Sequence, residues 1–497
     1  MPLPETGAPW PPPQMAPFYE QMRVNDAWYS GDKDRLSRVY GNSARPAERR
    51  RLWGRKRAQE QHRGRPDNRL HVPFPGDIAR TSADLLFADM PRISIPDADT
   101  ATADRLAQLI TEGHLSRTLI SGAEQAAGLS GVYLRATWDR EVTDRPILTV
   151  EQPDAAVPVH RFGMLREVTF WRELPGSTTQ TVWRHLELHE PGHIRHALYE
   201  GTPDNLGRAV PLTAHPDTAE LVTSLDPDGD GQTIATGIKD LTAAYVPNML
   251  PNRLHRGSPM GRSDYAAPLY DLFDSLDETW TSWMRDLRLG RARLLVSAGY
   301  LRNDGPGNGA TFDDDREVFT ELNISPTDER TSGITESQFE IRTEQHQRTA
   351  DSLIRQAAMG AGYSPESFGL EGGAVMTATE VDDNKALSMV TRKKKTGYWA
   401  DPLADMLYVM LQLDVAQFGQ RITPARPTVE FGTGVVPSPE RTAQTVEMLS
   451  RAEAISTETK VRMAHPEWDK TAVETEVTRI LSERDAPAAD PVGTFPM

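Results

Sequence analysis

The sequence predicts an α+β protein, mainly helical, from two patterns. Long segments in both halves repeat apolar residues every three or four positions, which is typical of amphipathic helices. Between residues 132 and 255, short alternating runs are bounded by Pro, Gly or Asp, which is typical of antiparallel strands. The 497 residues favour two to four domains or sub-domains. The absence of Cys excludes disulfide scaffolds, Cys metal sites and thiol nucleophiles.

The N-terminal part is predicted to begin with an arm and continue as helices. Residues 1–17 contain seven prolines, which indicates an extended arm outside the core. Residues 18–40 show a helical pattern interrupted at Ser30-Gly31, and residues 77–90 show another. Residues 99–131 predict one or two further helices. The strand region follows, with a hairpin turn expected at 190–193 because Pro and Gly occupy its centre.

The longest clean helical pattern covers 263–288, with Ser263 or Asp264 as its cap and Pro268 in its first turn. Its apolar stripe consists of Tyr265, Leu269, Leu272, Leu276, Trp280, Trp283 and Leu287. A Gly/Asp-rich insertion with strand-like runs at 291–301 and 317–324 separates it from a second helix at about Ser337–Met359. The spacing allows the two helices to run antiparallel.

The rest of the chain is also predicted to be mostly helical. A third helix is expected at Thr377–Gly397 and a fourth from a break at Asp401-Pro402 to Phe418. A strand-like run at 428–432 precedes helices that start near Ser438, Thr457 and Pro466. The tail after Asp485 is rich in Pro and Ala and is expected to be loose. No apolar run approaches the roughly 20 residues of a membrane span, and no signal peptide is visible.

Charge is distributed unevenly along the chain. The formal net charge is −16, which argues against a general nucleic-acid coating protein. Residues 35–69 nevertheless contain twelve basic and three acidic residues, a local charge of +9 that leaves −25 for the remainder. This asymmetry indicates either contact with a polyanion or an acidic neighbour, or a solvated helix with local pairing. The densest basic positions are Arg49, Arg50, Arg51, Arg55, Lys56 and Arg57.

A second basic cluster lies near the end of the third predicted helix. It consists of Arg392, Lys393, Lys394 and Lys395. Cations at this position complement the negative end of the helix dipole. The functional alternative is a ring of positive charge that faces DNA or an acidic neighbouring subunit.

Candidate chemical sites are weak. His185, His189, His193 and His196 lie in a strand–turn–strand pattern, where His185 and His189 share a face with Glu187. The run from Asp226 to Gly231 resembles half of a calcium loop, but Gly237 stands where a bidentate Glu is needed. Asp313–Asp315 lies in a Gly-rich segment. The chain has no phosphate-binding loop, no HExxH and no G-x-S-x-G. We therefore expect no enzyme, metal or cofactor.

Five segments, in order along the chain, resemble phage portal proteins of the SPP1 type, a family common in actinobacterial phages. They are NDAWYSGDKDRLSRVYG (25–41), LHVPFPGDIARTSADLLFADMPRI (70–93), GRSDYAAPLYDLFDSLDETWTSWMRDLRLGRARLLV (261–296), the segment from GYSPESFG to MTATEVDDNKALSMVTRKKK (362–395) and SPERTAQTVEMLSRAEAISTETKVRMAHPEW (438–468). The resemblance implies a portal fold with wing, stem, clip, tunnel loop and crown. Its parts would be an arm at 1–17, the wing at 18–262, stem helices at 263–289 and 341–360, the clip at 290–340, the tunnel loop and long wing helices at 361–419, the crown at 420–485 and a loose tail at 486–497.

The resemblance also implies function. The family forms a dodecameric ring at one capsid vertex of the virion, through which double-stranded DNA is packaged and ejected without sequence specificity. The terminase large subunit docks on the clip side and a head–tail adaptor later replaces it, while the major capsid and scaffolding proteins are neighbours. Assembly takes place in the host cytoplasm, without a membrane, a cofactor or an ATPase activity in the portal itself.

The same resemblance assigns roles to residues of this chain. The channel-facing tunnel loop would contain Glu366, Gly369, Glu371, Gly372 and Gly373. Stem packing would involve Leu272, Leu276, Trp280, Trp283 and Leu287, and the basic segment at 49–57 would face packaged DNA or the capsid shell. Two alternatives stay open. One is another virion structural protein, such as a minor capsid protein or head–tail adaptor. The other is a metal-dependent hydrolase that uses His185–His196 or Asp313–Asp315.

Overall fold

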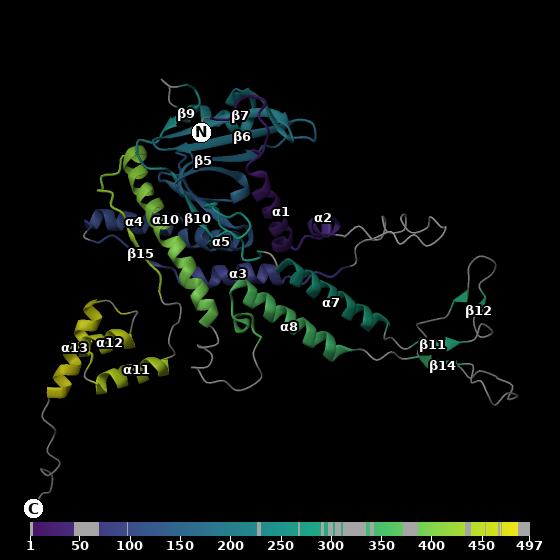
Figure 1. The fold of residues 1–497 in the computed structure, drawn as a ribbon. Helices are drawn as coiled ribbons and strands as arrows, with labels where there is room; N and C mark the ends of the chain where they lie inside the picture. The colour runs from purple at the N-terminus through teal and green to yellow at the C-terminus, as the bar shows by residue number, and fades with distance from the viewer. Residues whose placement is uncertain are drawn as a thin grey trace, which may run out of the picture. The chain divides into compact units, whose positions relative to one another are not determined.

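The computed structural model describes residues 3–43, 69–96, 98–225, 230–266, 269–289, 342–370, 386–432, 439–452, 454–465, 468 and 470–485, together with four short strands between residues 293 and 337. The chain divides into two compact units, Met1–Phe431 and Gly432–Met497. Figure 1 shows the helices and strands of each unit.

The first helices follow the predicted pattern. Helix α1 (Ala16–Ser30) ends at Gly31, whose φ of 63° is left-handed, and α2 (Lys33–Ser43) follows. A left-handed C-cap is the position where glycine avoids a Cβ clash, so the interruption at Ser30-Gly31 is confirmed. Further on comes α3 (Phe74–Phe87), which begins and ends three residues before the pattern predicted at 77–90. Helices α4 (Thr100–Glu112) and α5 (Leu115–Leu129) confirm the two helices allowed at 99–131.

The Pro-rich arm is part of the core, so the expectation that it lies outside is wrong. Trp10 is 2% exposed and packs edge-on against Trp171, with 5.7 Å between the ring centroids. The backbone N–H of Trp10 donates to the Asp204 carbonyl at 3.0 Å, and the backbone N–H of Leu206 donates to the Ala8 carbonyl at 2.9 Å. The arm is extended, but its apolar side chains gain enough burial on the neighbouring sheet to order it.

The antiparallel strand region is confirmed and forms two sheets. The smaller sheet has the order β10 (Ala243–Pro247), β2 (Gly131–Thr137), β3 (Ile147–Glu151). The larger has the order β4 (Ala156–Arg161), β5 (Met164–Glu173), β6 (Val182–Glu190), β7 (His193–Thr202), β8 (Asn205–Val210), with β9 (Thr233–Ala235) on β7. The short helix α6 (Pro216–Ala219) follows β8. Glu190 pairs with His193 around Gly192, whose φ is 89°, so the hairpin turn lies where it was predicted.

The two long central helices lie side by side and antiparallel (Figure 1). They are α7 (Leu269–Leu289) and α8 (Thr343–Ala361), and the strands β11 (Arg293–Val296) and β14 (Ile334–Ser337) pair beyond their far ends. The pair β12 (Arg302–Asn303) and β13 (Ala310–Thr311) lies between those strands in sequence. Two predicted starts are wrong. Ser337 belongs to a strand. Ser263 does not cap α7, because the helix begins at Leu269, six residues later; its hydroxyl accepts the Tyr265 N–H at 3.0 Å and donates to the Ala127 carbonyl at 2.9 Å.

Helix α10 (Ala386–Phe418) runs through Pro402 without interruption, so the predicted break is wrong. An internal proline costs about 3 kcal/mol of helix stability. Trp399, Leu403 and Leu407 on the same stretch are at most 1% exposed, and each contributes about 1.5–3 kcal/mol by burial. Tertiary packing therefore outweighs the proline. After α10, β15 (Thr428–Glu430) pairs with β1 (Arg92–Ser94), which confirms the predicted strand.

Two apolar clusters hold the larger unit together. One joins α3, α4, α5 and β2 to α10 through side chains such as Leu119, Leu134 and Leu403. The other joins α1 and α3 to the bases of α7 and α8 through Trp28, Ile78 and Phe273 among others. The helix pair is thus rooted in the same body that contains the two sheets.

The smaller unit contains α11 (Pro439–Arg451), α12 (Thr457–Ala464) and α13 (Lys470–Asp485). The Ser456 hydroxyl caps α12 by accepting the Thr459 N–H at 3.2 Å. The last helix starts at Lys470, later than the predicted Pro466. Residues 420–431 belong to the larger unit, so the predicted crown boundary at 420 differs from this division. No helix in the described part of the chain is long and apolar enough to cross a membrane.

Candidate functional site

The helix pair α7–α8 is held by an aromatic contact in its outer half. Trp283 of α7 stacks on His346 of α8, with centroids 6.0 Å apart and planes at 9°. Trp280 lies beside Trp283 at 5.1 Å, and Leu276 is 2% exposed in the core below. Aromatic pairs of this kind add directional packing to the apolar burial.

A carboxylate continues this contact toward the far end of the pair. Asp286 Oδ2 accepts hydrogen bonds from His346 Nε2 and Arg342 Nη2, both at 3.0 Å. These two donors lower the pKa of Asp286. Each donor favours the ionised form of the Asp286 carboxylate, so a charged hydrogen-bonded contact joins α7 to the beginning of α8.

The predicted stem-packing residues divide into two groups. Leu276 is buried, Leu272 and Trp280 pack against the same cluster, and Trp283 contacts α8. Leu287 is 41% exposed on the single subunit. Its packing against a neighbouring subunit stays a prediction.

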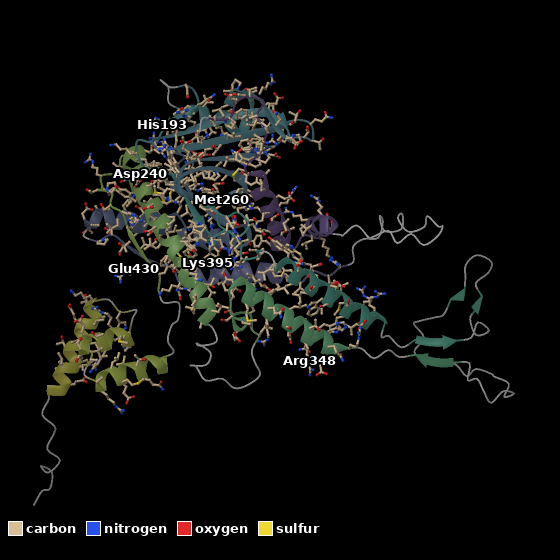
Figure 2. The ribbon with its side chains drawn as sticks, in the orientation of Figure 1. His193, Asp240, Met260, Arg348, Lys395 and Glu430 are labelled. Atoms are coloured by element: carbon tan, nitrogen blue, oxygen red, sulfur yellow. The ribbon has the colours of Figure 1, made fainter. Side chains whose placement is uncertain are left out.

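The basic cluster on α10, where Figure 2 labels Lys395, contains both buried and exposed residues. Lys395 is 2% exposed and its Nζ lies 2.7 Å from Asp264 Oδ2. Arg392 is 6% exposed and its Nε donates to the Leu85 carbonyl at 2.6 Å. The expectation that all four residues form one charged surface is therefore wrong, because helical spacing turns these two inward. Lys393 and Lys394 are exposed and remain candidates.

Lys395 belongs to a buried polar junction that the sequence did not reveal. Asp264 is 1% exposed, and it also accepts a hydrogen bond from the Tyr363 hydroxyl at 2.8 Å. Burial lowers the pKa of Lys395, and the charge and hydrogen bond of Asp264 oppose that effect. Asn248 and Ser82 complete the junction at 2.7 Å each from Lys395 Nζ. In the sequence, nothing distinguishes Lys395 from the other basic residues of its run, and Asp264 lies far away along the chain.

The first part of the predicted tunnel loop is a packed turn. Glu366 lies in a 3₁₀ turn, Pro365–Phe368, that ends at Gly369 with φ 74°. The Phe368 ring packs on Phe74 with centroids 5.1 Å apart. Glu366 is partly buried and Gly369 is exposed. Glu371, Gly372 and Gly373 lie outside the described residues, and their channel-facing role stays a prediction.

Two other predicted groups also lie outside the described residues. They are the basic positions Arg49, Arg50, Arg51, Arg55, Lys56 and Arg57, and the acidic run Asp313–Asp315. In the calcium-like run, Asp226 and Asp228 lie outside them too. The Asp230 carboxylate accepts the Gln232 N–H at 3.0 Å.

Three of the four histidines of the β6–β7 hairpin belong to a buried polar network. His185 Nε2 lies 3.1 Å from His196 Nδ1, and their rings stack at 6°. His189 lies between Glu187 Oε1 and Thr242 Oγ1, at 2.6 Å from each. His193 is exposed at the turn.

Burial and charge set the protonation of this network. Burial, and secondarily the charge of His196, lower the pKa of His185 to about 3. Burial would raise the pKa of Glu187, but Arg135 and His189 hold it well below its ordinary value. The arrangement therefore favours neutral His185 and ionised Glu187. Across the described ranges, no three His, Asp or Glu side chains are placed to hold a metal ion.

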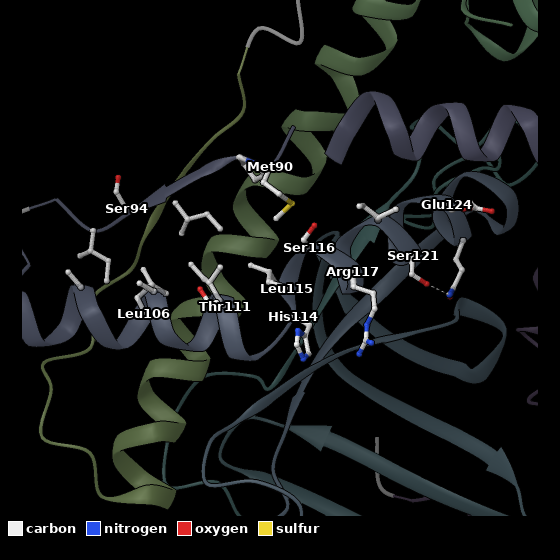
Figure 3. Close-up of a pocket in the computed structure, with 18 of the residues that line it drawn as sticks. Met90, Ser94, Leu106, Thr111, His114, Leu115, Ser116, Arg117, Ser121 and Glu124 are labelled. Atoms are coloured by element: carbon white, nitrogen blue, oxygen red, sulfur yellow. Dashed lines mark hydrogen bonds between the residues drawn. The ribbon is translucent and has the colours of Figure 1, made fainter. Parts of the chain in front are cut away.

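An open groove of about 1110 Å³ lies between β1, α4 and α5 (Figure 3). Its apolar lining includes Leu106, Ile110 and Leu115, while His114, Arg117 and Glu124 supply polar groups. The apolar positions of α4 and α5 cover more than one helix face, and this is the sequence signal that could have indicated the groove. No function was assigned to it from the sequence.

Comparison with known proteins identifies the family. The family model described as "Phage portal protein, SPP1 Gp6-like" matches residues 14–488. No curated protein matches the chain. One similar solved chain comes from "Neck of empty GTA particle computed with C6 symmetry"; it is 13% identical, with a TM-score of 0.42, and the match covers 79% of this chain and 90% of that chain. Another comes from "Neck of native GTA particle computed with C12 symmetry"; it is 12% identical, with a TM-score of 0.41, and the match covers 82% of this chain and 89% of that chain. Because the family model spans nearly the whole sequence, the chain belongs to the SPP1 Gp6-like phage portal proteins.

Proposed function

We propose that this portal chain assembles into a dodecameric ring at a unique capsid vertex and forms the channel for packaging and ejection of DNA. The observation that carries the proposal is the antiparallel pair α7–α8, rooted in the core of the larger unit and followed by the paired strands β11 and β14. In a portal family member, this pair corresponds to the predicted stem and the strands to the predicted clip.

Ring closure needs two different surfaces on each subunit, because each copy contacts the next head to tail. Leu287, at the outer part of α7, is a large apolar side chain left exposed on the single subunit. Packing against the next subunit would remove it from water. This supports a subunit contact along the stem.

The charge of the chain suits a channel that lets DNA slide. A strongly basic bore would bind DNA tightly through release of counterions. The chain carries −16 overall, and two adjacent lysines, Lys393 and Lys394, are exposed on α10. Sparse positive positions on an acidic subunit favour weak, sequence-independent contact.

The remaining partners follow from the family. The terminase large subunit and then a head–tail adaptor would dock at the β11–β14 side, and the major capsid and scaffolding proteins would surround the ring. Assembly would take place in the host cytoplasm before the ring becomes part of the virion. No catalytic role is proposed for the portal itself.

Electron microscopy and native mass of the purified chain test the ring. We expect particles near twelve times 55.3 kDa with a central hole. Leu287→Asp should lower the fraction of protein in rings without changing the melting temperature. Glu278→Gln, at an exposed position on the same helix, should leave the ring fraction unchanged. A compact dimer, or a monomer that persists at high protein concentration, would contradict a ring that closes through subunit contacts alone.

A further inference from the structure

The first turns of α10 contact the end of α8 through one buried face. Ser388, Thr391 and Lys395 lie at helical spacings of three and four, so they share that face. The Ser388 hydroxyl accepts the Ser364 N–H at 2.8 Å. The Thr391 hydroxyl donates to the Gly362 carbonyl at 2.5 Å. Two side chains of α10 therefore bond the backbone that directly follows α8.

Lys395, one turn further, connects α10 to the segment that precedes α7. Its three N–H donors all have acceptors, namely Asp264 Oδ2, Asn248 Oδ1 and Ser82 Oγ, each at 2.7 Å. The Lys395 side chain is 2% exposed and the Asp264 side chain 0%. Asp264 stands five residues before α7 begins. The ion pair is therefore a direct link between α10 and the segment that leads into the first stem helix.

The same carboxylate connects to α8 as well. Asp264 Oδ2 accepts the Tyr363 hydroxyl at 2.8 Å, and Tyr363 lies two residues after the end of α8. Asp264 Oδ1 accepts Asn248 Nδ2 at 2.9 Å. The segment before α7 and the segment after α8 thus share one buried carboxylate, and its counter-ion, Lys395, comes from α10, where Figure 2 labels it.

Such a pair is not needed for stability alone. Well-packed apolar residues of similar volume often stabilise a fold at least as well as a buried ion pair. A fully bonded pair, however, tolerates only one arrangement of its partners, because any displacement leaves a charge unpaired away from water. The ion pair therefore fixes the relative placement of α10, the segment before α7 and the segment after α8.

We propose that the Lys395–Asp264 pair is a latch that holds the inner ends of both stem helices to α10, so that α10 and the stem move as one body. The inference concerns coupling within a single subunit and does not rest on the proposed channel function. Opening the latch would free the segment before α7 and the segment after α8 together, whereas independent contacts would each loosen only one of them.

Hydrogen–deuterium exchange of the full chain tests the latch. In Lys395→Met, which keeps the length of the side chain and removes its charge, we expect amide exchange at residues 263–266 and 361–368 to accelerate at least tenfold at both segments. Lys394→Met, at the exposed neighbouring position, should leave both rates within twofold of the parent. Unchanged exchange in Lys395→Met, or acceleration at only one segment, would overturn the proposal.

Two further variants keep the test decisive if Lys395→Met folds poorly. Lys395→Met with Asp264→Asn leaves no lone buried charge, and faster exchange at both segments would support the latch, whereas parental rates would overturn it. Tyr363→Phe keeps both charges and removes only the bond to α8. Acceleration confined to 361–368 is expected there, and its absence would overturn the α8 part of the latch.

A distance measurement addresses the coupling itself. Because the chain has no Cys, spin labels can be placed at Ser275→Cys on α7 and Lys393→Cys on α10, both exposed positions, with labelled subunits diluted into unlabelled ones. We expect one narrow distance distribution in the parent and a broadened one after Lys395→Met. Equal widths in the two proteins would overturn the proposal.

Discussion

The indole of Trp283 in α7 stacks on the imidazole of His346 in α8, with 6.0 Å between the ring centroids and 9° between their planes. The same imidazole donates to Asp286, three residues along α7 from Trp283. His346 is therefore held on one side by an aromatic face and on another by a carboxylate. This contact fastens the outer half of the helix pair, where the apolar core below no longer reaches.

Trp283→Ala should loosen that outer half. We expect a loss of about 1–3 kcal/mol in the free energy of unfolding, less than for a fully buried Trp because Trp283 is partly exposed. Urea unfolding measures the loss, and hydrogen exchange at 343–350 should accelerate. Trp468→Ala is the matched control, since Trp468 also stacks on a histidine, His465, but in the smaller unit. Equal exchange at 343–350 in Trp283→Ala and the parent would contradict the role of the stack.

Trp10→Ala should detach the N-terminal arm from the larger sheet. Trp10 is 2% exposed, so its removal should cost about 3–5 kcal/mol. The arm bonds the backbone of β8 at Leu206, so amides at 205–210 should exchange faster. Glu5→Ala, at an exposed arm position, should change neither quantity. Parental exchange across β8 in Trp10→Ala would show that the arm does not protect this edge.

The His185–His196 pair predicts acid sensitivity. Burial lowers the pKa of both histidines, to about 3 for His185, so between pH 6.5 and that value the unfolded chain binds more protons than the folded one. Stability should therefore fall as pH decreases through this window, by up to about 1.4 kcal/mol per pH unit for each histidine. Glu187, whose folded pKa lies below its ordinary 4.5, adds a loss of the same sign at lower pH.

Urea unfolding at several pH values checks this dependence. The double variant His185→Gln, His196→Gln should show a flatter dependence between pH 6.5 and 4.5. His193→Gln is the control, because this histidine is exposed on the same hairpin. A double variant with the parental pH dependence would show that other groups cause the acid sensitivity.

The sequence predicted those elements whose pattern is local. The stripe of Leu272, Leu276 and Trp280 indicated α7, and Pro-Gly at 191–192 indicated the hairpin, because helical period and turn chemistry are properties of neighbouring residues. Pro402 misled the prediction of α10, since the local cost of a proline is outweighed by burial of Trp399 and Leu403 against other elements. That compensation depends on contacts distant in the sequence.

The candidate site was less predictable for the same reason. Four adjacent basic residues read as one surface, yet Lys395 is buried because Asp264, 131 positions earlier, supplies its counter-ion. Asp264 itself resembles a helix cap when only its neighbours are considered. Trp10, in a Pro-rich arm, gains its partner Trp171 only when the sheet forms. Pairings over such separations leave no periodic signal in one sequence.

The split of the basic cluster gives a prediction for DNA binding. Lys393 and Lys394 are exposed, so changing both to Gln should leave the melting temperature unchanged and weaken non-specific binding of double-stranded DNA. For every phosphate that the variant no longer neutralises, the slope of log K against log salt should decrease in magnitude by about 0.9. Filter binding of the purified protein over a range of salt concentrations measures the slope.

Lys239→Gln provides the comparison, because this exposed lysine lies in the same unit but between β9 and β10. Its salt dependence should equal that of the parent. If Lys393→Gln, Lys394→Gln also keeps the parental slope, the two lysines do not contact DNA, and the exposed charge of α10 serves another surface. A reduced slope at unchanged melting temperature separates a charge contact with DNA from a structural defect, since loss of the buried Lys395 would lower stability as well.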